Sequence, residues 1–135
     1  MATPMRMARV AAAIAADGVL REAHLEQTAA RSAEPDPFLD RKASHVLAGY
    51  MRDVVLTGTG RSLKNHPGRI AGKTGTAELA GRASHAWFVG FAPYGAATRR
   101  IAFAIIIENA GYGGASAAPV AGEIVTAAAQ SGLVQ

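Results

Sequence analysis

The sequence predicts an α/β chain of the α+β kind with three layers, in which helices flank an antiparallel sheet. Three strand-like runs, 69–79, 84–92 and 100–108, follow one another through glycine-bearing turns of hairpin length, which is typical of an antiparallel meander. The third run is apolar on both of its alternating faces, and this suits a strand covered by helices on each side. Helical patterns before and after the strands supply those helices.

The first helix is predicted over residues 3–17. Thr3 and Pro4 form an N-cap followed by a proline at the first helical position, and Gly18 closes the helix. The expected buried stripe recurs at spacings of three and four residues and consists of Met5, Ala8, Ala12, Ala15 and Val19.

The second helix is predicted over residues 40–56, and the glycines at 58 and 60 end its pattern. Its apolar stripe consists of Val46, Leu47, Tyr50, Met51, Val54 and Val55. The charged side of the same helix, expected to face elsewhere, carries Arg41, Lys42, His45 and Arg52. Before this helix, residues 20–28 read as a short extended piece and 29–37 as a surface loop.

The third helix is predicted to close the chain. A polar loop at 61–68 precedes the strands, and a glycine-rich loop at 109–116 follows them. Pro119 is expected in the first turn of the closing helix, which ends near Gly132. Its expected stripe consists of Val120, Ile124, Ala127 and Ala128.

The composition limits the classes of protein to consider. A chain of 135 residues, 50% hydrophobic and 6% aromatic, forms one domain or part of one around an aliphatic, alanine-rich core. The net charge of +4 is dispersed along the chain without interleaved aromatic residues, so no nucleic-acid partner is expected. There is no cysteine, and the histidines His24, His45 and His66 have no metal-ligand spacing, so no metal and no cofactor are expected.

The run at 72–78 carries the chemistry of the sequence. Lys73 offers a compact positive charge for a carboxylate, and Thr74 adds a rotatable hydroxyl. Gly75 allows a ligand to approach the backbone closely, and the backbone NH of Thr76 can then donate to a developing oxyanion. On a strand, the lysine and the glycine point to one face and the two threonines to the other.

Two other interpretations of this run remain open at this point. An ordinary strand with a solvated lysine would carry the same residues. Gly-Lys-Thr also ends the phosphate-binding loop of nucleotide-binding proteins, but that loop needs an earlier glycine at position 67, where this chain has proline, and a helix that starts at the lysine.

Several motifs, taken in order, resemble the C-terminal part of penicillin-binding protein transpeptidase domains, especially the class B enzymes. They lie at 72–78 and in the segments 3–8, 12–15, 54–60, 85–93, 108–109, 113–114 and 117–120, and so cover nearly the whole chain. The resemblance implies a serine acyl-transfer fold with a five-stranded antiparallel sheet, three strands of which lie here. Lys73, Thr74, Gly75 and Thr76 would then bind the carboxylate of a peptidoglycan stem peptide or of a β-lactam. Lys73 and the Thr76 NH would act in catalysis, with the NH completing the oxyanion hole.

The chain departs from the family in its serines. The family needs Ser-x-x-Lys for the nucleophile and its base, and a Ser-x-Asn loop for proton transfer. No serine of this chain has a lysine three residues on or an asparagine two residues on; those tested are Ser32, Ser44, Ser62, Ser84, Ser116 and Ser131. Residues 1–135 are therefore expected to be the C-terminal part of a transpeptidase domain, inactive alone, with the nucleophile outside them.

The resemblance also implies partners and a location. The family places the strand matching 101–108 in the middle of its sheet, so an unpaired apolar edge is expected here. A complementing N-terminal part of the domain or a second copy of the chain would cover that edge. Full-length relatives work outside the cytoplasm at the cell membrane, although this chain has no signal or membrane segment. The alternatives are a non-catalytic binding or scaffolding module of the same fold and, less favoured, a nucleotide-binding protein.

Overall fold

The computed structural model describes residues 2–23 and 36–135, and it confirms the predicted three-layer α+β architecture. In chain order the elements are α1 (Pro4–Ala15), β1 (Val19–Leu20), β2 (Asp36–Pro37), α2 (Arg41–Leu56), the 3-10 helix η1 (Arg61–Leu63), β3 (Ala71–Leu79), β4 (Arg82–Ala92), β5 (Ile101–Ile107) and α3 (Gly113–Gln130). The predicted extended piece at 20–28 and loop at 29–37 fall mostly outside the described residues. Their described ends, β1 and β2, pair antiparallel.

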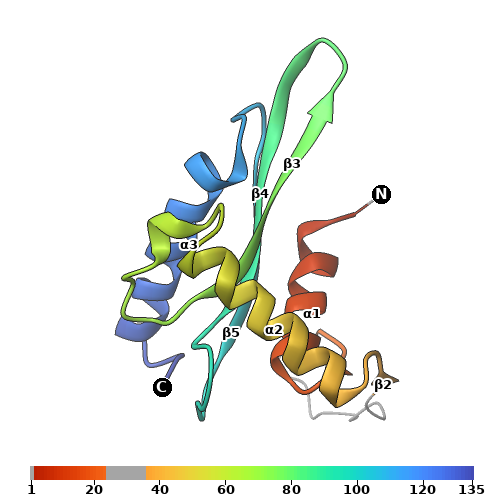
Figure 1. Cartoon of the computed structure of the whole chain (residues 1–135), viewed down its shortest axis with the longest axis vertical. Helices are drawn as coiled ribbons and strands as arrows, with labels where there is room; N and C mark the ends of the chain where they lie inside the picture. The colour runs from red at the N-terminus through yellow and green to blue at the C-terminus, as the bar shows by residue number, and fades with distance from the viewer. Residues whose placement is uncertain (1, 24–35) are drawn as a thin grey trace.

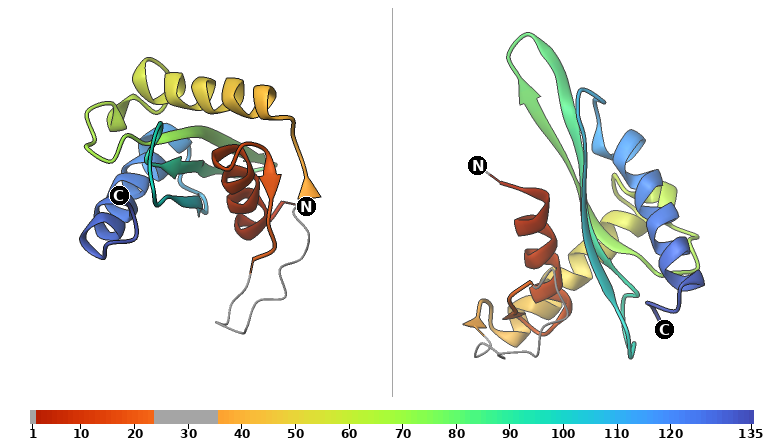
Figure 2. Two further views of the ribbon diagram at one scale, coloured as in Figure 1. Left: turned by 90° about the horizontal axis from the view of Figure 1, so that it is seen from below. Right: turned by 180° about the vertical axis from the view of Figure 1, so that it is seen from behind.

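The main sheet is antiparallel with the order β3-β4-β5, as the three consecutive strand patterns predicted. Helices α1 and α3 pack on its opposite faces, and α2 crosses it on the β3 side (Figures 1 and 2). The β3–β4 hairpin projects beyond the helices at one end of the molecule (Figure 1). β4 is therefore paired on both sides, whereas β3 and β5 are the edge strands of the described sheet.

Local side-chain caps explain where the first two helices begin. The Thr3 hydroxyl accepts a hydrogen bond from the Arg6 NH, and the Asp40 carboxylate accepts one from the Ala43 NH at 2.9 Å. Gly18 follows the end of α1 and has a φ of +89°, which favours glycine. A side chain at this position would also collide with the carbonyl oxygen of Leu39. Both predicted helices are confirmed.

The predicted buried faces of α1 and α2 are wrong in part. In α1, Ala11 and Ala13 are buried while Met5 is 52% exposed, because a run of alanines gives no strong apolar side to mark the core. In α2, the residues of the expected stripe that stay exposed are Val46, Leu47 and Tyr50. Arg52, expected to face elsewhere, instead turns toward the sheet and donates from Nη1 to the Ile70 carbonyl at 2.7 Å.

The predicted start of α3 is also wrong. The helix begins at Gly113, six residues before Pro119, and includes part of the segment expected to be a loop. An interior proline removes one backbone hydrogen bond and crowds the carbonyl four residues earlier, and the buried residues on both sides of Pro119 offset this cost by packing on the strands. Of the expected stripe only Ala128 is buried, while Ile124 is exposed and Val125 is fully buried instead. The buried residues of α3 are Gly113, Ala117, Ala118, Ala121, Gly122, Val125 and Ala128.

Alternate residues of the strands fill two cores. On the α3 face, Phe88 is fully buried and stacks on Phe103 with ring centroids 6.3 Å apart. This core joins the strands to α3, η1 and the end of α2. On the α1 face, Phe91 packs with Ala71 and Met51, together with Ile14. Among the described residues, no helix is long and apolar enough to cross a membrane.

Phe88→Ala is expected to be the most destabilising single truncation in the sheet, because it removes a fully buried ring from the core on the α3 face. We expect a loss of about 3–5 kcal/mol in the free energy of unfolding. Urea unfolding followed by the fluorescence of the single tryptophan, Trp87, measures it. The matched control is Phe38→Ala, whose ring is 46% exposed and which should cost less than half as much. Equal losses in the two variants would contradict the assigned core.

Candidate functional site

The four residues singled out in the sequence, Lys73 to Thr76, lie together on the edge strand β3. Lys73 pairs with Val89, Thr74 with Phe88, Gly75 with Trp87 and Thr76 with Ala86 across the β3–β4 ladder. Lys73 and Thr76 are exposed, and Thr74 is buried. As predicted, the lysine and the threonines point to opposite faces, so that β3 forms a ridge between two grooves.

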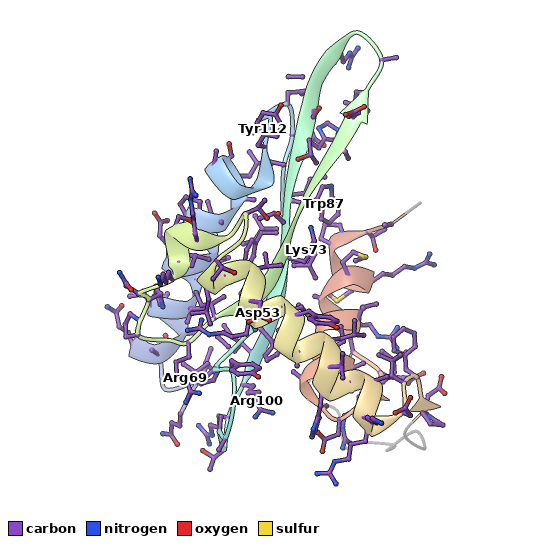
Figure 3. All side chains as sticks on the ribbon, viewed as in Figure 1. Asp53, Arg69, Lys73, Trp87, Arg100 and Tyr112 are labelled. Atoms are coloured by element: carbon purple, nitrogen blue, oxygen red, sulfur yellow. The ribbon has the colours of Figure 1, made fainter. Side chains whose placement is uncertain are left out.

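The groove on the α1 face has a volume of about 320 Å³, and we call it the lysine groove. Lys73 and Trp87 lie between the sheet and α1 (Figure 3). Apart from Lys73 and the β3 positions Thr74 and Gly75, its lining is apolar and consists of Ala2, Met7, Val10, Ala11, Ile14, Met51, Trp87 and Val89. The Lys73 ammonium bends back over the strand and donates to the carbonyl oxygen of Thr74 at 2.8 Å. The positive charge is therefore held beside the threonine.

The groove on the other side of β3 has a volume of about 630 Å³, and we call it the threonine groove. Its lining is rich in hydroxyls and backbone, and consists of Thr57, Gly58, Thr59, Arg61, Ser62, Thr74, Thr76, Tyr112, Gly113, Gly114 and Ala115. Thr74 lines both grooves. The ammonium of Lys73 and the hydroxyl of Thr74 can thus reach one anionic group at the ridge.

The hydroxyl of Thr74 has a specific partner, the hydroxyl of Thr59, with the two oxygens 2.5 Å apart. Thr59 lies in the turn after α2, where the NH groups of Gly58 and Gly60 both donate to the Val54 carbonyl. This turn was predicted only as the end of a helix. The contact with Thr74 joins residues 15 positions apart in the chain, and nothing in the local pattern signals it.

The first residues of α3 pack against β3, β4 and the turn that holds Thr59. A Cβ at Gly113 would lie 2.2 Å from the carbonyl oxygen of Trp87 and 2.5 Å from that of Gly75. A Cβ at Gly114 would lie 2.3 Å from the carbonyl oxygen of Thr59. Both glycines therefore let the helix pack directly on the backbone of the strands and of the turn. Tyr112 stands just outside this contact and is 77% exposed (Figure 3).

The aromatic and histidine side chains of β4 near the site differ in burial and in role. Phe88 and Phe91 are buried, as aromatic residues of a central strand should be. Trp87 is only half-buried and lines the lysine groove, a role that its alternation with Phe88 could have indicated. His85 is structural, because its Nδ1 accepts a hydrogen bond from the Asn109 NH.

The nucleotide-binding interpretation is wrong for this run. Lys73 lies inside β3, whereas a phosphate-binding loop places its lysine at the start of a helix. No group of three potential metal ligands occurs in the described residues. Of the histidines tested for metal spacing, His24 lies outside the described part of the chain.

The serines of the described residues do not form a nucleophile next to Lys73. Ser44 is buried and donates to the Ile14 carbonyl at 2.8 Å, and Ser116 donates to the Ala110 carbonyl at 2.8 Å. Ser62 lines the threonine groove, but its neighbour Lys64 is two residues on, not three. Ser32 lies outside the described residues.

A family model described as "Penicillin binding protein transpeptidase domain" matches residues 1–126, which is most of the chain. The chain belongs to this family. It is 32% identical to peptidoglycan D,D-transpeptidase PbpA of Mycolicibacterium smegmatis over 150 residues, covering 96% of this chain and 30% of that protein. It is 33% identical to peptidoglycan D,D-transpeptidase MrdA of Acinetobacter baumannii, covering 86% of this chain and 21% of that protein.

Solved structures of the same family share the fold. Pseudomonas aeruginosa PBP2 in complex with WCK 5153 superposes with a TM-score of 0.75 at 34% identity, covering 91% of this chain and 28% of that one. Penicillin-binding protein A from M. tuberculosis, as an imipenem acyl-enzyme complex, gives 0.71 at 26% identity, covering 94% and 31%. The chain thus spans about a third or less of the length of these penicillin-binding relatives.

Thr59→Val is expected to free the Thr74 side chain, because it removes the hydroxyl that fixes it. We expect a cost of about 0.5–1.5 kcal/mol in stability, together with altered NMR chemical shifts and rotamer averaging of the Thr74 methyl group. Thr57→Val is the matched control, since the Thr57 hydroxyl bonds only within its own helix, to the Asp53 carbonyl. An unchanged Thr74 signal in Thr59→Val would contradict the assigned contact.

Proposed function

We propose that this chain forms the substrate-binding wall of a peptidoglycan D,D-transpeptidase site, and that its ligands are peptidoglycan stem peptides and β-lactams. The observation that carries the proposal is the placement of the exposed Lys73 and the buried Thr74 hydroxyl at adjacent positions of the edge strand β3, beside two grooves, in a chain of the penicillin-binding transpeptidase family. The imipenem acyl-enzyme complex of a structural relative, penicillin-binding protein A from M. tuberculosis, supports the choice of ligand.

Lys73 and Thr74 would recognise the carboxylate of the ligand. A carboxylate accepts charge-assisted hydrogen bonds, which are stronger than neutral ones. The ammonium of Lys73 already lies against the Thr74 backbone, and the Thr74 hydroxyl is oriented by Thr59. A ligand carboxylate at the ridge would therefore meet two donors whose positions are set in advance.

Gly75 and Thr76 would serve the reacting carbonyl. A Cβ at Gly75 would lie 3.1 Å from the Cβ of Trp87, so the glycine keeps the lysine groove open beside the strand. Thr76 is exposed within the edge strand β3, and its backbone NH would donate to an oxyanion that develops during acyl transfer. In this proposal the second donor belongs to the nucleophile itself.

The nucleophile and its base would come from outside residues 1–135. Acyl transfer by a serine needs an activating base within hydrogen-bond reach, and no serine of the sequence has the Ser-x-x-Lys or Ser-x-Asn pattern. The wall alone would bind ligand reversibly and form no acyl-enzyme. A non-catalytic binding or scaffolding module of this fold is the second candidate, and the same absence of a nucleophile favours it.

A partner would cover the free edge of β5. This strand is apolar throughout, from Ile101 to Ile107, and pairs only with β4 among the described strands. Unpaired apolar edges are templates for further strand pairing. We propose that the N-terminal part of a transpeptidase domain pairs there, and that a second copy of the chain does so when that part is absent. The working location would be outside the cytoplasm, at the cell membrane.

Fluorescent penicillin tests the ligand and the wall together. The chain alone is expected to show no covalent adduct by intact mass, while titration with the β-lactam shifts the NMR amide signals of Lys73 to Thr76. Lys73→Ala should weaken that binding about tenfold or more, since it removes a charged hydrogen bond. Lys64→Ala, a lysine outside both grooves, should leave it unchanged.

Two outcomes would count against this function. A covalent adduct would show a nucleophile within residues 1–135. Binding that Lys73→Ala leaves unchanged would remove Lys73 from the site.

Self-association through β5 is expected in the isolated chain at micromolar concentration. Ile106→Lys places a charge on the half-exposed edge strand and should shift the molecular mass measured by light scattering toward the monomer. The control is Val46→Lys on the exposed apolar side of α2. A chain that is monomeric at all concentrations, or that Val46→Lys alone makes monomeric, would contradict the use of this edge.

A further inference from the structure

A third cavity lies at the opposite end of the sheet from the threonine groove, between α1, α2 and the turn that joins β4 to β5. It has a volume of about 350 Å³, and we call it the arginine cleft. Its apolar floor includes Ile14, Ala48 and Phe91. Its charged and polar lining consists of Asp17, Arg41, His45, Tyr94 and Arg100. None of these residues lines either groove beside β3, apart from Ile14.

One face of α2 supplies cations along this cleft. Arg41, His45 and Ala48 line it at spacings of four and three residues, and Arg52 follows one turn beyond Ala48 on the same face. Arg52 is half-buried and uses one guanidinium nitrogen for the Ile70 carbonyl. Arg52 itself does not line the cleft, and no other hydrogen bond from its guanidinium group occurs among the described residues.

Two more guanidinium groups lie at the β4–β5 turn: Arg100 belongs to the turn and lines the cleft, whereas Arg69 comes from the segment before β3 and lies next to the cleft. Arg100 donates to the carbonyl oxygens of Pro93, Gly95 and Ala15, which fixes it over the turn. Arg69 approaches Gly95 from the other side, with Nη2 only 2.8 Å from where a Cβ of Gly95 would lie. Arg69 and Arg100 lie together at this end of the sheet, far from Tyr112 (Figure 3).

At this end of the sheet, the arginines outnumber the acidic side chains among the described residues that line the cleft. Asp17 is the only acidic residue that lines the cleft, and it pairs with His45 at 2.7 Å and with Arg41 at 3.4 Å. These contacts, the hydrogen bond from His45 first, hold the pKa of Asp17 below its usual value. No ion pair to Arg52, Arg69 or Arg100 occurs in the described part of the chain. Burial and the nearby charge of Arg69 lower the pKa of Arg52, so like charges meet here.

We propose that the arginine cleft is a binding site for a phosphate-bearing ligand, whose negative charge is met by Arg41 and Arg100 in the lining and by Arg52 and Arg69 next to it. Guanidinium groups donate in a fork that fits phosphate oxygens, and a dianion offsets the repulsion among several of them. The apolar floor gives room for an uncharged group attached to the phosphate. A lipid headgroup and a soluble diphosphate share this chemistry.

Asp17 competes with the ligand for Arg41 and His45. Asp17→Asn removes the competing charge while keeping a residue that tolerates the backbone there, whose φ is +55°. This variant is therefore expected to bind phosphate compounds more tightly than the parent chain, by about threefold or more. A loss of affinity in Asp17→Asn would contradict the assigned site.

Pyrophosphate is the probe for the site in solution, used in calorimetric titrations at constant ionic strength. The test variant is Arg41→Gln combined with Arg69→Gln, because both side chains are exposed, whereas Arg52 and Arg100 hold backbone carbonyls. We expect this variant to lose at least about tenfold in affinity. Arg82→Gln, an exposed arginine at the distant β3–β4 hairpin, removes one charge elsewhere and should change the affinity less than twofold.

Flotation with phosphatidylglycerol vesicles, compared with phosphatidylcholine vesicles, tests the lipid source. Binding that the double variant loses in either arm supports the site, and the arm that shows it identifies the source. The proposal is overturned if neither probe binds beyond an ionic-strength-matched chloride control. It is equally overturned if Arg82→Gln loses as much binding as the double variant.

Discussion

The register of β3 against β4 is the constraint on which the rest of the structure depends. It places Thr74 opposite Phe88 and Gly75 opposite Trp87. A slip of β3 by one residue against β4 would turn Lys73 toward the core on the α3 face and Thr74 away from it. Two glycines fix the register sterically, because a Cβ at Gly72 would lie 2.4 Å from the ring of Phe88. A Cβ at Gly90 would lie 2.5 Å from the carbonyl oxygen of Ala71.

Because of this register, the two faces of β3 line two grooves of different chemistry. The side of Lys73 is an apolar groove against α1, and the side of Thr74 is a groove of hydroxyls and backbone at the start of α3. The Lys73 ammonium bends over the strand and donates to the Thr74 carbonyl, so its positive charge lies where the two grooves meet. A ligand that is anionic at one end and apolar at the other fits that junction.

Sequence reasoning was sufficient where the signal is local. The strands, the cap at Thr3 and the grouping of Lys73 to Thr76 follow from patterns within a few residues, and the structure has them. It was insufficient in α1, because no sequence pattern in an alanine-rich helix distinguishes the burial of Ala11 from the burial of Ala12. It also missed the pairing of Thr59 with Thr74 and the contact of Gly113 with the strands, which join segments distant in the chain.

Two apolar surfaces remain uncovered in the described structure, and they have different consequences. The outer side of α2, with Val46, Leu47 and Tyr50, is a side-chain surface whose backbone hydrogen bonds are already made within the helix. The free edge of β5 combines apolar side chains with backbone groups that lack a strand partner, and it therefore gains hydrogen bonds as well as burial when another strand pairs with it. Association of this chain, with itself or with the rest of a transpeptidase site, is thus expected to begin at β5 and to cover α2 only afterwards.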